Sequence, residues 1–123
     1  MASKAPKPTV SERLKGPRLC PNCSGTVERK SPKGPMPIFC GKACKVEHNN
    51  RHMVEGRAVI AFLKAWRIDR GSGEIAQRAF AELCSITDQF NAADLAANRP
   101  RADYYAATIL ADGTRYFDRQ RTR

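Results

Sequence analysis

Residues 39–52, FCGKACKVEHNNRH, place two cysteines and two histidines within fourteen positions. The whole chain of 123 residues holds only five cysteines and two histidines, so most of its metal-binding side chains are gathered here. A second cysteine pair lies upstream in CPNC, residues 20–23. The resulting pattern, C-x2-C-x16-C-x3-C, is one in which two short-spaced pairs can converge as four thiolates around a tetrahedral Zn²⁺.

We therefore predict that Cys20, Cys23, Cys40 and Cys44 bind one structural zinc ion. A Cys-Pro-x-Cys segment is typical of a tight turn whose backbone N–H groups point at the sulfurs and lower the thiol pKa. The second pair precedes a helical pattern, so Cys44 is expected in the first helical turn, where the helix dipole favours a thiolate. Sites closed by four cysteines are folding elements, so we expect this metal to stabilise the fold and to do no chemistry.

The segment between the two pairs is expected to form a short β-hairpin. Its strand-forming residues are Thr26, Val27, Ile38 and Phe39, and the turn is supplied by SPKGPMP, residues 31–37. A knuckle, a hairpin and then a helix is the order of elements in a treble clef.

Through these residues the chain resembles small treble-clef zinc-finger proteins of bacterial and phage type, whose second pair reads Phe-Cys-Ser-x-x-Cys at a helix start. Phe39, Cys40 and Cys44 match that pattern, and Gly41 stands at the position of the serine. Residues 20–45 are also similar to the zinc segment of the bacterial DNA gyrase inhibitor family, which runs from Cys-Pro-x-Cys through Val-Glu and a proline-containing loop to Phe-Cys-x-x-x-Cys. This likeness implies a treble-clef module and suggests a DNA-handling enzyme as a partner, but it stops at Cys44 and does not carry gyrase inhibition with it.

The two histidines follow Cys44 at steps of four, so Cys44, His48 and His52 share one helix face. In one alternative a histidine replaces a cysteine in the zinc shell. In another, HNNRH is the metal-binding helix of a His-Asn-His nuclease. Four cysteines already close the shell, however, and no further histidine is present to act as a general base. We expect both histidines to be ordinary polar helix residues that touch phosphate at most.

Two long helices and a short one are predicted after the zinc segment. The first runs from Cys44 to the GSG at residues 71–73, and its apolar stripe comprises Met53, Gly56, Ile60 and Leu63, widened by Val59 and Trp66. Gly56 lies inside this helix and is expected to mark a bend or a close helix crossing. The second helix precedes Pro100 and has the stripe Ile75, Ala79, Leu83, Ile86 and Phe90. Residues 101–110 are expected to form the third helix.

These elements predict an α+β fold that is mainly α. It comprises a treble-clef zinc knuckle with a short β-hairpin, followed by a long helix packed in an antiparallel helical hairpin. We expect three parts: a flexible basic tail (1–18), a zinc module (19–55) and a helical hairpin with a short third helix and a basic C-terminal end (56–123). Cys84 is expected to be a small residue at the edge of the second helix stripe, without a ligand role.

Positive charge is concentrated in the first part of the chain. Residues 1–70 contain fifteen lysines and arginines and five acidic residues, whereas residues 71–123 contain seven of each. A locally positive surface attracts the phosphate backbone, and salt weakens the attraction. The candidate nucleic-acid contacts are Arg13, Lys15, Arg18, Arg29, Lys30, Lys33, Lys42, Lys45 and Arg51.

The composition and motifs of the chain favour a binding function over catalysis. No phosphate-binding glycine loop, serine nucleophile motif or paired carboxylate of suitable context is present, so we expect no enzyme activity. No window is apolar enough for a membrane span, and the odd number of cysteines argues against a disulfide framework, so we expect a cytoplasmic protein without a membrane partner. The leading hypothesis is a regulatory or accessory nucleic-acid-binding protein, with DNA favoured over RNA. Two alternatives stay open: a protein-binding regulator or assembly subunit, and a basic tail that serves only solubility.

Overall fold

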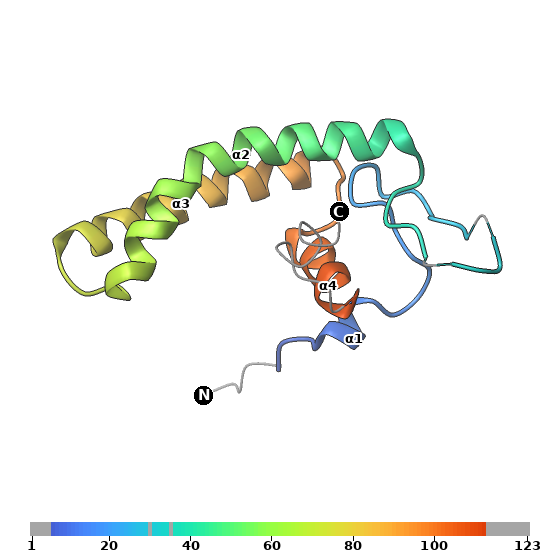
Figure 1. The fold of residues 1–123 in the computed structure, drawn as a ribbon, viewed down its shortest axis with the longest axis horizontal. Helices are drawn as coiled ribbons and strands as arrows, with labels where there is room; N and C mark the ends of the chain where they lie inside the picture. Colours follow the sequence, from blue (N-terminus) through green and yellow to red (C-terminus); the bar gives the residue numbers. More distant parts are fainter. Residues whose placement is uncertain (1–5, 30, 35, 113–123) are drawn as a thin grey trace.

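The structure is a computed structural model that describes residues 6–29, 31–34 and 36–112. Within these residues the helices are α1 (Val10–Arg13), α2 (Lys42–Asp69), α3 (Glu74–Ala96) and α4 (Ala102–Asp112). Figure 1 shows α2 and α3 side by side as a long pair, with α4 and α1 together beneath it. The loops that carry the cysteines lie at the end of the pair where α2 begins. The predicted helical hairpin and third helix are therefore confirmed.

The turn between α2 and α3 follows from its glycines. Arg70 takes a left-handed backbone conformation with φ of 52°, and Gly71 and Gly73 follow with φ of 86° and 89°. Only glycine adopts such angles without steric cost. Two glycines shortly after Arg70 therefore allow the helix to end and the chain to reverse within a few residues. The predicted helix stop at residues 71–73 is confirmed, and the short turn brings α3 back along α2.

Small side chains form the contact between α2 and α3. Ala76 and Ala79 on α3 are buried, which lets the two helices approach closely. Toward the turn, the rings of Trp66 and Phe80 stack with centroids 5.8 Å apart. The buried part of α3 in this contact therefore consists of alanines, and the ring pair of Trp66 and Phe80 packs nearer to the turn.

The predicted apolar stripe of α2 is only partly in this contact. Met53, Ile60 and Leu63 are exposed, with relative accessibilities of 58%, 49% and 42%. Val59 and Trp66, which were expected only to widen the stripe, are half-buried. Two packed helices cover one face of each other, and α3 lies over the neighbouring face of α2. The prediction that Met53, Ile60 and Leu63 belong to the core is wrong for this reason.

The close helix crossing that Gly56 was expected to mark is also absent from the described chain. A Cβ built on Gly56 would meet no neighbouring side chain and no backbone of another described segment within 4 Å. Glycine in a helix interior costs about 1 kcal/mol relative to alanine. The packing between α2 and α3 therefore does not explain why a glycine occupies this position.

The predicted β-hairpin is wrong. No strand occurs in residues 6–29, 31–34 and 36–112, and Thr26 instead pairs with Leu19 in an isolated antiparallel bridge. The Val27 N–H donates to the Arg18 carbonyl over 2.8 Å, so the backbone of this segment is already used by the other arm of the knuckle. Pro37 has no N–H to donate beside the other predicted strand. The α+β class is replaced by a mainly α fold.

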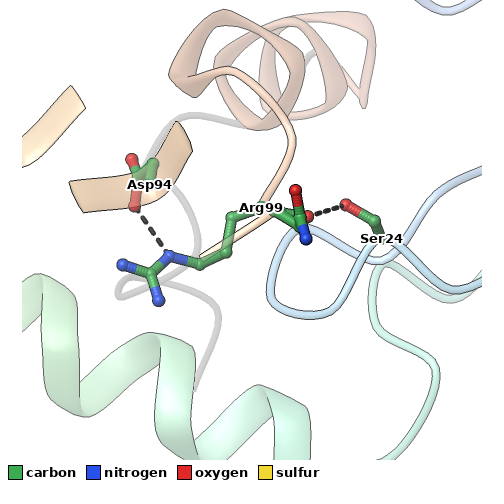
Figure 2. Close-up of polar contacts among 4 residues, drawn as sticks. Ser24, Asp94 and Arg99 are labelled. Atoms are coloured by element: carbon green, nitrogen blue, oxygen red, sulfur yellow. Dashed lines mark hydrogen bonds and ion pairs between the residues drawn. The ribbon is translucent and has the colours of Figure 1, made fainter. Parts of the chain in front are cut away.

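Polar contacts join the knuckle to α4 and to the segment that precedes it. The Leu19 N–H donates to the Tyr104 hydroxyl over 2.9 Å, and Tyr104 is buried. The Ser24 hydroxyl donates to the Asn98 carbonyl over 2.6 Å, as Figure 2 shows. Residues about 75–85 positions apart in the sequence are thereby held together.

Two ion pairs stabilise the same region. Arg13 at the end of α1 contacts Asp103 at 3.0 Å, which ties α1 to α4. Arg99 donates from Nε to Asp94 over 2.8 Å and closes the turn after α3 (Figure 2). Both Arg99 and Asp94 are largely buried, so this pair is screened less by solvent than the exposed Arg78–Glu74 pair.

The division of the chain into three parts, 1–18, 19–55 and 56–123, stays a prediction.

Replacing Ala79 with leucine should destabilise the helical hairpin. Ala79→Leu forces extra volume into the closest part of the α2–α3 contact, and overpacking of this kind costs about 1–3 kcal/mol. Ala81→Leu is the matched control, because Ala81 is an exposed residue of the same helix. Urea unfolding followed by circular dichroism measures both, and equal stability of the two variants would contradict the proposed packing.

Candidate metal centre

The four predicted cysteine ligands converge. The sulfur atoms of Cys20, Cys23, Cys40 and Cys44 all lie within 4.8 Å of one another. Cys23 Sγ is 3.6 Å from Cys40 Sγ, which is 3.5 Å from Cys44 Sγ. Four sulfurs about 2.3 Å from a central zinc ion would be about 3.8 Å apart, whereas a disulfide needs about 2.05 Å. The spacing fits four ligands around one metal ion and excludes a disulfide.

The knuckle holds the first pair through its own backbone. The Cys20 N–H donates to the Gly25 carbonyl over 2.7 Å, and the Ser24 N–H donates to the Cys20 carbonyl over 2.9 Å. Ser24 takes a left-handed conformation, with φ of 63°, which turns the chain sharply after Cys23. The Gly25 N–H then points at Cys23 Sγ over 3.4 Å. A Cβ at Gly25 would lie only 3.2 Å from this sulfur, so glycine permits the close approach.

The second pair is held by the start of α2. Cys44 lies in the first helical turn, as predicted, and Cys40 lies just before the N-cap residue Gly41. Gly41 makes no side-chain cap hydrogen bond, as expected where glycine replaces a serine. The positive end of the helix dipole therefore faces the metal centre, where it favours thiolate charge.

Burial, backbone hydrogen bonds and neighbouring thiols give Cys20 and Cys40 very different pKa values. Burial alone would raise the pKa of Cys20, but backbone hydrogen bonds from Cys40, Asn22 and Cys23 outweigh it and lower the pKa to about 7. The neighbouring thiols of Cys44, Cys23 and Cys20 raise the pKa of Cys40 to about 12. Without a cation, the Cys20 thiolate forms readily, whereas the Cys40 thiol resists ionisation. A divalent cation reverses this effect, since it stabilises all four thiolates.

These ligands can hold one zinc ion. An all-sulfur tetrahedral donor set suits Zn²⁺, and calcium or magnesium would require oxygen ligands. The bound metal would join the knuckle to the N-terminus of α2. With four protein ligands the shell is full, so such a site stabilises structure and leaves no coordination position for a substrate.

In the described part of the chain, neither histidine belongs to the cluster formed by the four cysteines. His48 is nevertheless buried, with 2% of its surface exposed, and its ring lies 3.9 Å from that of His52 and 4.3 Å from that of Tyr105. Phe39 covers it at 4.9 Å. Burial lowers the pKa of His48 to about 4 and also lowers the pKa of His52, so both rings are neutral at pH 7. His48 is therefore a core residue, which the prediction of an ordinary polar helix residue missed.

The predicted basic contacts lie in different environments. Lys15, Lys33, Lys42 and Lys45 are exposed. Arg29 is exposed and donates to the Gly34 carbonyl over 2.7 Å. Half-buried positions are occupied by Arg13, which pairs with Asp103, and by Arg18 and Arg51. Lys30 lies outside the described residues.

Several residues that shape the centre carry no local sequence signal. Ser24, Asn98 and Tyr104 position the knuckle, yet nothing near residues 98–104 in the sequence points to a partner at residues 19–24. The sequence did contain a signal for the position of His48, because His48 lies one helical turn after Cys44 on the same helix face. Cys84 is exposed on α3 and lies outside the cysteine cluster of the described residues, and its lack of a ligand role stays a prediction.

Comparisons with protein families, with curated proteins and with solved structures find no match to this chain. The likeness of residues 20–45 to treble-clef and gyrase-inhibitor zinc segments is therefore supported only as far as the four-cysteine cluster. No helix in the described part of the chain is long and apolar enough to cross a membrane.

Loss of one ligand should remove the metal. Cys40→Ser takes one sulfur from the cluster and should lower zinc affinity by more than the roughly 10–100-fold that loss of an outer hydrogen bond causes. Zinc measured per chain after gel filtration, together with the thermal unfolding midpoint, reports the effect. Cys84→Ser is the control and should keep one zinc per chain. Full zinc content in Cys40→Ser would contradict the assignment.

Acid should destabilise the protein through His48. Its pKa is about 6.5 in the unfolded chain and about 4 when folded, so below pH 6.5 the unfolded state binds more protons. The contribution of neutral His48 is complete above pH 6.5 and is lost as the pH falls toward 4. Between pH 7.5 and 5.5 the loss is about 1 kcal/mol. Urea unfolding of zinc-loaded protein at these two pH values measures it.

The control for this titration is His48→Met, which has a similar volume and no titrating group. It should lose about 1 kcal/mol less than the parent protein over the same pH interval. Zinc release and other carboxyl or histidine titrations affect both proteins, so the difference between them isolates His48. The same acid dependence in both proteins would show that His48 is not the titrating group.

Proposed function

We propose that the chain is a cytoplasmic, structural-zinc protein that binds nucleic acid through the basic surface of its zinc module, in a regulatory or accessory role and without catalysis. The observation that carries the proposal is the start of α2. Lys42 and Lys45 are exposed in its first turn, which contains no acidic residue. Exposed lysines with no carboxylate in the same helical turn favour phosphate.

Further cations extend this surface along the zinc module. Lys15 precedes the knuckle, and Arg29 and Lys33 occupy the loop that connects the two cysteine pairs. All three are exposed, so phosphate contacts would require little desolvation of other groups. Arg13 is bound to Asp103, and Arg51 is half-buried, so we expect both to contribute less than the exposed lysines. The surface favours the phosphate backbone and supplies no base-specific pattern of its own, and DNA is our preferred partner.

A second candidate function is favoured by a different observation. The hairpin of α2 and α3 exposes large apolar side chains, among them Val54 (66%), Ile68 (80%) and Ile75 (74%). Exposed apolar side chains in such number are typical of surfaces that contact proteins. In this alternative the chain regulates or inhibits a DNA-handling enzyme, or is a subunit of a larger assembly.

Binding to a mixed-sequence DNA duplex across a salt series separates the two functions. Phosphate binding weakens log-linearly with salt, with a slope of roughly −0.9 for each phosphate neutralised. The double variant Lys42→Glu/Lys45→Glu should therefore reduce the slope by about two and weaken binding at low salt. Fluorescence anisotropy with end-labelled DNA measures both quantities on protein of known zinc content.

The matched control is Lys64→Glu/Arg67→Glu, which makes the same charge change at exposed positions farther along α2. It should alter the slope much less than the change at the helix start. Equal effects of the two double variants would mean that only net charge matters and would contradict the site. No binding at low salt by folded, zinc-loaded protein would favour a protein partner instead.

A further inference from the structure

A cavity of about 300 Å³ lies between α2, the end of α3 and the start of α4, beside the zinc knuckle. Its walls include His48, His52 and Gly56 from α2, Phe90 and Asn91 from α3, and Tyr105 from α4. This volume is at the lower end of the range that small-molecule sites occupy. The cavity is therefore large enough for a small ligand.

Gly56 keeps this cavity open. Glycine destabilises a helix interior relative to alanine, and no close contact with another described segment requires it here. Gly56 nevertheless lines the cavity, and a Cβ added to it would meet open space within 4 Å. The open space beside Gly56 therefore supports a role in the cavity wall over a role in the α2–α3 packing.

His48 supplies a second, independent sign of a ligand. Its side chain is 98% buried, and in the described part of the chain neither Nδ1 nor Nε2 has a hydrogen-bond partner. Buried polar atoms are normally paired, so an unpaired imidazole in a cavity wall calls for a partner that the protein does not provide. Both nitrogens are shielded in this structure, so the imidazole would have to turn toward the cavity for a bound molecule to pair with them.

The chemistry of the walls favours a neutral, planar ligand. Phe90, Tyr105 and His52 line the cavity with aromatic rings, of which His52 and Tyr105 also contact each other and His48. Flat molecules stack on aromatic side chains, and Asn91 offers an amide with both donors and an acceptor. Both histidines are neutral at pH 7, so each ring offers one donor and one acceptor.

The charges around the cavity balance. Among the described residues, its lining contains two arginines, Arg51 and Arg101, and two carboxylates, Glu55 and Asp94. Asp94 is already paired with Arg99, and Arg101 contacts Asp103. The cavity therefore selects neither an anion nor a cation.

We propose that this cavity binds one nucleobase, a neutral planar heterocycle that hydrogen-bonds at its edges and stacks on its faces. The inference rests on the proposed function, which places a nucleic acid on the adjoining zinc module. The occupant would be an unpaired base of that nucleic acid, since the base must leave a duplex stack to enter a cavity. Base stacking on aromatic side chains depends little on base identity, so the cavity would prefer unpaired bases without reading sequence.

Two DNA probes with equal charge test this inference on the full, zinc-loaded chain. One is a duplex with a single bulged adenine, and the other carries an abasic site at the same position. Phosphate contacts are the same for both, so the difference in Kd reports the base alone. We expect about ten-fold tighter binding of the bulged adenine, within the range measured for base–aromatic stacking.

Filling the cavity should remove this preference. Gly56→Leu places a side chain in the cavity and should bring the ratio of the two Kd values close to one, while binding to a fully paired duplex stays unchanged. Ala58→Leu is the matched control, because Ala58 is exposed on the same helix, and it should keep the ten-fold ratio. If Gly56→Leu disturbs folding, Asn91→Leu at an exposed position of α3 tests the same wall.

The outcomes separate this inference from the proposed function. Equal affinity for the bulged and abasic duplexes, or a ten-fold preference that persists in folded Gly56→Leu, would overturn the base site and leave duplex binding in place. If no duplex binds, the proposed function fails, and free adenosine then tests the cavity alone as a nucleoside site. Shifts of the His48 and His52 imidazole NMR signals that Gly56→Leu abolishes would support a nucleoside as the occupant, and their absence would overturn the base site.

Discussion

The convergence of four cysteine sulfurs from two separate segments is the constraint on which the rest of the zinc module depends. Crowded thiols resist shared ionisation, as the pKa of Cys40 at about 12 shows, so all four can be thiolates together only when a cation compensates the charge. A metal held by all four sulfurs would fix the knuckle and the start of α2 relative to each other. The segment between them can then remain without strands, because the metal replaces the ladder that would otherwise join its ends.

The sequence predicted the elements whose causes are local. Cysteine spacing identified all four candidate ligands, and helical periodicity with the glycines at 71 and 73 identified α2, α3 and the turn between them. The β-hairpin failed because propensity cannot show which partner a backbone N–H will choose, and Val27 bonds to Arg18. The core stripe of α2 failed because a helix with apolar residues on two faces does not reveal which one its neighbour covers.

The candidate functional surfaces differ in how much of each could be predicted from the sequence. Charge predicted a basic surface on the zinc module from the sequence, but the ion pair between Arg13 and Asp103 joins residues far apart and could not be foreseen. The cavity beside His48 is built from three helices, so its existence depends on tertiary packing. Gly56 was visible in the sequence as an anomaly, but its proposed meaning appears only when the space next to it is known.

The bond between Leu19 and Tyr104 also bears on how the protein is made. During synthesis the zinc segment leaves the ribosome before the long helices, and a metal can be captured as soon as Cys44 has emerged. Its remaining hydrogen-bond partners, at Asn98 and Tyr104, are translated only after both long helices. The part of the chain that is synthesised first is therefore completed last, and until then a newly made zinc module must be held together by its metal and by local hydrogen bonds alone.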